Sequence, residues 1–357
     1  MATSLANFIA TTQHRRPGQI MYHAGFTDDL QRRVQQHVGE GNDIGRHLGF
    51  FKSAGVGMRR PGGLPPLDFS RYWQGQDLPP GTTFDGKGMA MVPSGFYHFW
   101  GIISPLRNAR SLADIENYPM DDMTDWDTLH LAGEVEKAHA AGLVVQAWVG
   151  HMYENAWQIR GYEEFLVDLM DRPEWADCLL ERYARQNMIA AVAYAKAGVD
   201  WISCGDDVAN QNALMFAPDT WRRLFHSKWA GIWNAVKSIN PNCRIWYHSD
   251  GNVGAIVGDL VEAGVDILNP VQPECVDVDA IHSRYGHCLT FDGLIGTQST
   301  MPFGKPEDVR ARVKEIIEKY GRNGGLIVSP THVLEPEVPV ENIEAMCRAC
   351  REFGSFE

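Results

Sequence analysis

The chain has 357 residues, of which 44% are hydrophobic and 22% are charged, fractions typical of globular proteins that exclude a disordered or collagen-like chain. Its formal net charge of −13 argues against nucleic-acid binding, which takes its affinity from clustered lysines and arginines. No run of about eighteen apolar residues occurs, and the N-terminal MATSLANFIATTQHRR has no signal-peptide pattern, so we expect neither a membrane span nor secretion.

Two runs in the N-terminal third are candidate strands. GQIMYHAG spans residues 18–25, and GMAMVPSGFYHFWGII spans residues 88–103. Both are apolar runs next to glycine, which is typical of strands in a sheet with turns at its ends.

The segment 51–100 is rich in glycine, proline and aromatic residues and shows little helical periodicity. Long irregular segments in compact domains are often lids or binding loops. We predict that it carries Tyr72 and Trp73, together with Tyr97, His98 and Trp100, towards a substrate. The alternative is a packing arm between subunits.

From about residue 130 onward one arrangement repeats: a short apolar run, a polar or glycine-containing break, then an amphipathic helical stretch. One such stretch has Pro306 at its start and Gly321 at its end, with a predicted buried stripe that includes Val309, Val313 and Ile316. The strands predicted by this repeat are 143–150, 199–205, 243–250, 265–270, 288–293 and 325–330.

Nearly continuous apolar strands that alternate with helices indicate a parallel sheet covered by helices. Neither GxGxxG nor GxxxxGK[ST] occurs, so nothing indicates the usual nucleotide-binding open sheets. We therefore predict an α/β fold, a (β/α)8 TIM barrel over residues 1–357 as a single domain, with the irregular segment as an insertion over the barrel mouth.

Polar and ionisable residues follow each of the six later strands. In a barrel of this kind the catalytic groups lie at the carboxyl ends of the strands. A buried charge is costly unless it is paired or used, so these groups are more than a core needs. They are His151 with Glu154, Asp206 with Asp207, His248 with Asp250, Asn269 with Gln272, Asp292, and His332.

His248 and Asp250 lie two residues apart, so an extended backbone would point both side chains to the same side. Imidazole and carboxylate are suitable ligands for a divalent metal, and His332 could complete the site while water or substrate takes a fourth position. Without a metal, Asp250 would orient His248 as a general acid or base. A structural role is the third interpretation.

Two further pairs each have two interpretations. Asp206 and Asp207 would repel each other unless a cation or hydrogen-bond donors offset their charges, so we expect at least one to be functional, although one could cap the next helix. Glu154 and Arg160, in HMYENAWQIRG, could form a buried ion pair or hold a substrate.

Five runs carry a family resemblance: ENAWQIRGYEEFLVDL, CGDDVANQ, YHSDGNVGAIVGDLVEAGVDILNPVQPE, LTFDGLIGTQSTMPFGKPEDV and GGLIVSPTHVLEPEVPVENI. They resemble the uroporphyrinogen decarboxylase superfamily, in particular its methyltransferase-like branch. The resemblance implies a (β/α)8 barrel with either cofactor-free decarboxylation of a tetrapyrrole or zinc-assisted methyl transfer that involves a corrinoid.

The chain departs from both patterns. Similar decarboxylases carry M-R-Q-A-G-R near the N-terminus, whereas residues 21–26 read MYHAGF and lack both arginines that would hold substrate carboxylates. Similar zinc methyltransferases show H-x-C and a later cysteine, whereas Asp250 and His332 occupy those places here. A His/Asp/His ligand set is chemically harder than a His/Cys/Cys set, so it admits divalent metals other than zinc. No D-x-H-x-x-G motif occurs, so a corrinoid would come on a separate protein.

These observations predict a methyltransferase or demethylase for a small substrate, aromatic ones included, with a divalent metal, zinc foremost, at His248, Asp250 and His332. The alternative is a metal-independent decarboxylase in which His332 or Asp292 protonates the carbanion. A non-catalytic binding protein is the third class.

The remaining expectations concern roles, compartment and assembly. Seven cysteines, an odd number, indicate reduced thiols and a cytoplasmic location. Barrels of this family suggest a homodimer. The expected catalytic residues are Glu154, Asp206, Asp292 and His332, and the expected substrate contacts are His23, Tyr97, His151, Arg160, Asp207 and Gln272.

Overall fold

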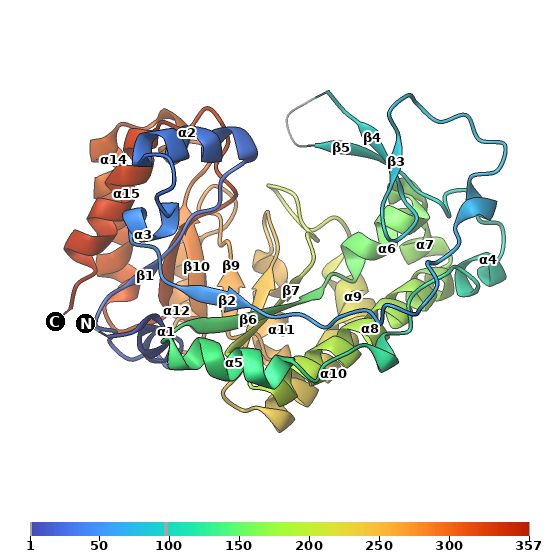
Figure 1. Ribbon diagram of the computed structural model, residues 1–357, viewed down its shortest axis with the longest axis horizontal. Helices are drawn as coiled ribbons and strands as arrows, with labels where there is room; N and C mark the ends of the chain where they lie inside the picture. The colour runs from blue at the N-terminus through green and yellow to red at the C-terminus, as the bar shows by residue number, and fades with distance from the viewer. Residues whose placement is uncertain (1, 96–98, 357) are drawn as a thin grey trace.

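The computed structural model describes residues 2–95 and 99–356. Its central feature is an eight-stranded sheet in the order β1-β11-β10-β9-β8-β7-β6-β2, in which all neighbouring strands are parallel. The sheet curls through the molecule with helices on its outer side (Figure 1), which confirms the predicted barrel fold. The strands are β1 Met21–Tyr22, β2 Ser53–Gly55, β6 Val144–Gly150, β7 Trp201–Gly205, β8 Arg244–His248, β9 Ile267–Asn269, β10 Thr290–Ile295 and β11 Leu326–Pro330.

The barrel is partly open between its two edge strands. β1 and β2 are two and three residues long and stand at opposite ends of the sheet order. The amide of Phe51, just before β2, donates to the carbonyl of Tyr22 at 3.2 Å. One backbone hydrogen bond thus brings the two edges together where a full ladder would close the barrel.

Helices cover the outer face of the sheet. Helix α14 begins with Pro306 in its first turn and buries Val309, Val313 and Ile316 as predicted, because these apolar residues recur on one side of the helix. The α-helices are α1 Ser4–Thr12, α2 Asp28–Val38, α3 Ile44–Leu48, α4 Leu112–Glu116, α5 Leu131–Ala140, α6 Tyr153–Arg160, α7 Tyr162–Asp171, α8 Pro173–Ala197, α9 Pro218–Trp221, α10 Ser227–Ile239, α11 Val257–Ala263, α12 Val278–Tyr285, α13 Thr300–Phe303, α14 Pro306–Ile316 and α15 Val340–Phe353. Short 3-10 turns are η1 Ser70–Tyr72, η2 Met123–Asp125 and η4 Gly254–Ile256, and π turns are η3 Arg222–His226 and η5 Ile317–Gly321.

Alternation along the strands decides what faces the barrel interior. In β8, Tyr247 packs against Trp229 and Trp233 of α10, so Trp246 and His248 point inward. The end of the interior where the strands begin is filled by an apolar cluster of Phe8, Met21, Val144, Trp201, Ile267 and Ile327. Polar residues therefore occupy the interior positions nearer the carboxyl ends of the strands.

One predicted strand was wrong. The described residues of the run 88–103 do not join the barrel but form β4 Ala90–Pro93 and β5 Trp100–Ile103. With β3 Thr83–Phe84 they make an antiparallel sheet in the order β3-β4-β5. The second barrel strand is instead β2, inside the segment expected to be irregular. Its sequence, Ser-Ala-Gly, has no β-branched residue, so only its pairing with β6 makes it a strand.

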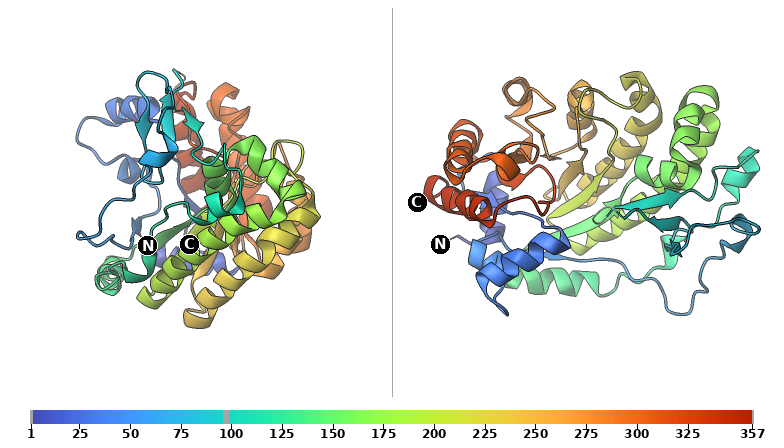
Figure 2. Two further views of the ribbon diagram at one scale, coloured as in Figure 1. Left: turned by 90° about the vertical axis from the view of Figure 1, so that its right-hand side faces the viewer. Right: turned by 90° about the horizontal axis from the view of Figure 1, so that it is seen from above.

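Residues 59–95 and 99–127 form an arm, which an antiparallel bridge between Arg59 and Asp127 closes at its base. Figures 1 and 2 show the arm extending from the barrel on the side of α6 and α7. Tyr72 packs on Tyr118 and Trp73 packs on Phe84 within the arm, so both rings contribute to its packing. Their contact with a substrate stays a prediction. Tyr97 and His98 lie outside the described residues, and Trp100 is an exposed residue of β5.

Among the helices of the described residues, none combines the length and the apolar character that crossing a membrane requires.

Candidate active site

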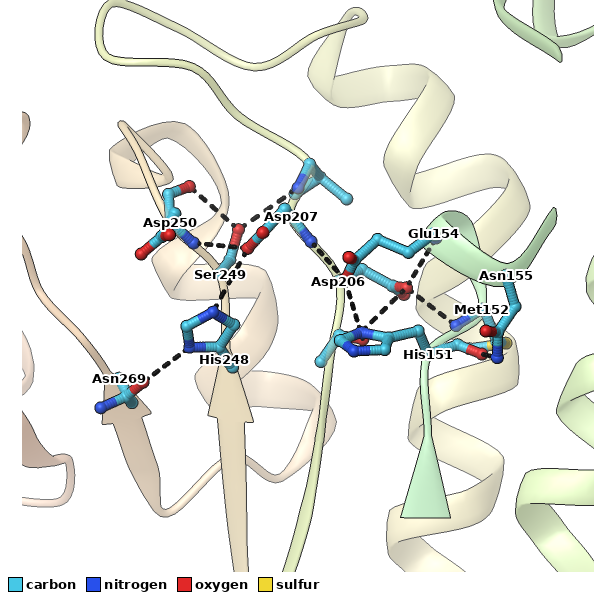
Figure 3. A network of polar contacts seen from close by, with 12 residues as sticks. His151, Met152, Glu154, Asn155, Asp206, Asp207, His248, Ser249, Asp250 and Asn269 are labelled. Atoms are coloured by element: carbon cyan, nitrogen blue, oxygen red, sulfur yellow. Dashed lines mark hydrogen bonds and ion pairs between the residues drawn. The ribbon is translucent and has the colours of Figure 1, made fainter. Parts of the chain in front are cut away.

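Ionisable side chains gather where β6, β7 and β8 end (Figure 3). Neighbouring parallel strands end at the same edge of a sheet, so residues far apart in the chain meet there. In each of two clusters, one ligand atom per residue lies within 4.8 Å of the others. The first cluster is Asp207, His248 and Asp250, and the second is His151, Glu154 and Asp206.

Hydrogen bonding sets the tautomer of His248. Its Nδ1 lies 2.6 Å from Oδ1 of Asn269, and Nδ2 of Asn269 donates to the carbonyl of Asp292 at 3.1 Å. The second bond orients the amide, so Oδ1 is the acceptor and Nδ1 of His248 carries the proton. In the neutral ring, Nε2 therefore holds a free lone pair, and it faces Oδ1 of Asp207 at 3.5 Å.

The two carboxylates beside His248 concentrate negative charge. Oδ1 of Asp207 accepts from the amide of Asp250 at 2.8 Å. Oδ1 of Asp250 is buried and has no hydrogen-bond partner in the part of the chain that the structure describes. Burial raises the pKa of Asp250; the charge of His248 lowers it, and that of Asp207 raises it further. The cluster is thus arranged to hold a proton or a cation.

Asp206 is a fully buried carboxylate, 0% exposed. Its Oδ1 accepts from the amides of Met152 and Glu154 at 2.8 and 3.3 Å, and its Oδ2 accepts from Nε1 of Trp229 at 3.2 Å. It therefore caps α6, not the helix that follows it. Burial raises the pKa of Asp206 to about 7, so it can gain or lose a proton near neutral pH.

His151 and Glu154 form an ion pair next to Asp206. Nδ1 of His151 lies 2.6 Å from Oε2 of Glu154 and also contacts the carbonyl of Gly205. Burial would lower the pKa of His151, but Glu154 outweighs it and the pKa is raised. Burial would raise the pKa of Glu154, but His151 outweighs it and the pKa is lowered. Both shifts favour a charged pair.

A cavity of about 830 Å³ extends into the barrel. Asp292, 1% exposed, accepts hydrogen bonds there from His23 Nε2 at 3.0 Å, Trp246 Nε1 at 2.8 Å and Ser329 Oγ at 2.8 Å. Burial would raise the pKa of Asp292, but the charge of His23 and these bonds lower it. Burial would lower the pKa of His23, but Asp292 raises it. Other walls of the cavity are Phe51, Gln146, Trp148, Trp201 and Ser203.

Two predicted substrate contacts have other roles. Arg160 is 2% exposed; its Nε donates to Asp168 at 2.6 Å and its NH1 to the Leu106 carbonyl at 2.8 Å. Its ion pair is with Asp168 and not with Glu154, and buried acceptors engage its guanidinium. Gln272 is buried, and its Oε1 accepts from the amide of Gly251 at 2.6 Å. That bond supports the loop after β8.

His332 stands at the edge of the candidate metal site. It is exposed, and its Nε2 lies 4.0 Å from Oδ2 of Asp250. It is not one of the three residues whose ligand atoms all lie within 4.8 Å of one another, and Asp207 takes the third place in that cluster. Sequence reasoning also missed Asn269 as the residue that orients His248. The positions of both residues held a signal: Asn269 ends β9 and Asp207 follows β7, and these two strands flank β8.

Comparisons with known proteins agree with the fold. A uroporphyrinogen decarboxylase of Methylococcus capsulatus is 28% identical over 27% of this chain and 26% of its own length, and one of Trichodesmium erythraeum is 29% identical over 34% and 32%. The chain thus matches about a quarter to a third of these relatives. A structure described as a methyltransferase from Methanosarcina mazei has a TM-score of 0.67 at 16% identity and covers 99% of both chains, which shows a shared fold. Residues 107–353 match the family described as uroporphyrinogen decarboxylase (URO-D), and the chain belongs to this family.

Proposed function

We propose that the protein is a methyltransferase or demethylase that acts on small molecules, aromatic ones included, with a divalent metal at the barrel mouth. One observation carries the proposal: Nε2 of His248 lies 3.5 Å from Oδ1 of Asp207, and Asp250 brings a second carboxylate into the same cluster, within 4.8 Å of both residues. The ion pairs recorded for these carboxylates within the described ranges are with histidines, not with lysine or arginine. Without a proton or a cation between them, these lone pairs would repel one another.

The residues present suit a metal ion. Asp207, His248 and Asp250 offer one imidazole and two carboxylates, a hard donor set that suits zinc, manganese or iron. Asn269 would hold the His248 ring in the ligating tautomer, as outer-shell partners of metal-bound histidines do. When bound, the metal would polarise the heteroatom that gains or loses the methyl group.

The second cluster would manage the proton of the reaction. Asp206 has a pKa of about 7 but is fully buried, so it cannot touch a substrate. Nδ1 of His151 lies 3.9 Å from Oδ1 of Asp206, and the His151 side chain is partly exposed. His151 would therefore contact the substrate, while Asp206 and Glu154 would set its charge.

The cavity favours a small, flat substrate. Trp148, Trp201 and Trp246 line it, and aromatic side chains bind flat apolar rings by stacking and edge contacts. The chain lacks the two arginines that similar decarboxylases use for tetrapyrrole carboxylates. Because it also lacks a D-x-H-x-x-G motif, a corrinoid that carries the methyl group would be bound to a separate protein.

Metal content tests the proposal. Protein purified without a histidine tag is analysed by mass spectrometry as wild type, His248→Ala and Asp250→Asn, with the exposed His47→Ala as a matched control. We expect about one equivalent of metal in wild type and control and a loss in both site variants. The metal-loaded enzyme should then methylate cob(I)alamin from a panel of methoxybenzenes. Wild-type protein that takes up no metal when supplied would overturn the proposal.

The alternative, a metal-independent decarboxylase, is favoured by the His23–Asp292 pair inside the cavity. Asp292 was predicted to protonate the carbanion, but its lowered pKa makes it a carboxylate that has no proton to give. His23, whose pKa Asp292 raises despite burial, would be the acid. Release of carbon dioxide by metal-stripped enzyme, abolished in His23→Ala, would establish this function instead.

A further inference from the structure

A second cavity of about 260 Å³ lies between the arm and the barrel; we call it the arm pocket. Lys87 comes from the arm, Tyr183 and Asn187 come from α8, and His151 comes from the candidate active site. Trp148 lines both the arm pocket and the larger barrel cavity. The arm pocket is therefore next to the place where we expect the reaction.

Buried hydrogen-bond donors in the arm pocket lack partners. Tyr183 and Asn187 are each 3% exposed, and within the described residues neither Oη of Tyr183 nor Nδ2 of Asn187 has a hydrogen-bond partner. Nε1 of Trp126, which also lines the pocket, is likewise buried without one. Leaving such groups unsatisfied destabilises the free protein, and a ligand with acceptor atoms would relieve that cost.

The charge of the lining favours an anionic ligand. Nζ of Lys87 contacts Oδ1 of Asn155, and an ammonium group has further protons to donate. Asp121, the acidic residue of the lining, is paired with Arg60 at 3.1 Å. A carboxylate, with its two acceptor oxygens, satisfies several of these donors at once.

The rest of the lining is apolar and the space is small. Tyr118, Met120, Met123, Val149 and Ile159 contribute to the walls. The volume is below the ~300–1,000 Å³ of sites for drug-sized ligands, which suits a single substituted ring. The lining therefore combines apolar walls with donors suited to a carboxylate.

We propose that the arm pocket binds the carboxylate end of a small aromatic acid through Tyr183, Asn187 and Lys87. Trp148 and His151 line the same pocket and would contact the remainder of the molecule, which extends to the barrel mouth. This inference rests on the proposed function because it names the substrate class of that site, but its test needs neither metal nor turnover.

Benzoate is the probe, measured by isothermal titration with metal-stripped full-length protein. We expect benzoate to bind, benzyl alcohol to bind at least about tenfold more weakly, and Tyr183→Phe and Asn187→Leu each to weaken benzoate about tenfold, as expected for a lost hydrogen bond to a charged group. The matched control is Tyr194→Phe on the same helix, whose hydroxyl already accepts from the amide of Met58. It should bind benzoate like wild type.

Thermal unfolding separates a ligand-binding role from a structural one. Removing an unsatisfied buried hydroxyl should leave the Tm of free Tyr183→Phe unchanged or raised, while the Tm increase caused by benzoate should shrink. Any of four results would overturn the inference. Two concern wild type: benzoate does not bind, or benzoate and benzyl alcohol bind equally well. The other two are an unchanged benzoate affinity in Tyr183→Phe and Asn187→Leu, and a lowered Tm of free Tyr183→Phe. Failure of the metal proposal would leave benzoate binding unaffected, so the two failures are distinguishable.

Discussion

Asn269 holds His248 in one tautomer, because its Oδ1 lies 2.6 Å from His248 Nδ1 and its own amide is oriented by the carbonyl of Asp292. The consequence is that Nε2, the nitrogen that faces Asp207, is free to bind a metal. Asn269 thus acts on the site through His248.

Asn269→Ala should weaken metal binding by about 10–100-fold, the usual effect of losing an outer-shell partner of a ligating histidine. Zinc titration with a competing chromophoric chelator measures the affinity. Asn269→Asp, which keeps an acceptor for Nδ1, should retain most of it. Equal affinities in wild type and Asn269→Ala would contradict this positioning role.

Asp206 should make stability fall as pH rises. Burial raises its pKa to about 7 in the folded protein, whereas the unfolded chain has a value near ~3.9. Between these values the unfolded chain releases the proton that the folded protein keeps, so the contribution of Asp206 to the free energy of unfolding falls from about pH 4 to about pH 7. Urea unfolding of wild type and Asp206→Asn at several pH values measures the difference. A difference that is constant with pH would count against the raised pKa.

The Arg160–Asp168 ion pair should matter for folding and not for substrate binding. The two side chains are 2% and 0% exposed, and removing Arg160 leaves the buried Asp168 carboxylate with Arg172, 38% exposed, as its remaining ion-pair partner. Arg160→Met should lower the free energy of unfolding by about 3 kcal/mol. Arg222→Met, which breaks a pair with Asp259 that water screens, should change the free energy of unfolding much less. KM should be unchanged in Arg160→Met, and a large rise in KM at full stability would restore the substrate role.

His23 and Asp292 should be energetically coupled. They are 3.0 Å apart, and each shifts the pKa of the other towards the charged form. Asp292→Asn should cost about 3 kcal/mol in wild type and clearly less in a His23→Leu background. A double-mutant cycle of urea unfolding at neutral pH measures the coupling. Additive effects of the two substitutions would show that Trp246 and Ser329 alone stabilise the Asp292 carboxylate.

The sequence by itself determined those elements that are set by residues close together in the chain. Six barrel strands and helix α14 could be predicted because the spacing of apolar residues is a local pattern, and the side of each element that is buried in a two-layered fold follows from that spacing. His248 and Asp250 could be placed together for the same reason, since two positions along a strand end share a side. Their partners in the cluster could not be chosen this way.

Only the tertiary structure decided which distant residues meet. Asp207 takes the place expected for His332 because β7 lies next to β8, whereas β11 lies three strands away in the sheet order. The strand β2 exists through its ladder with β6, and its three small residues carry no propensity for it. Strand order and side-chain pairing follow from long-range packing, and a pattern within one stretch of sequence does not encode them.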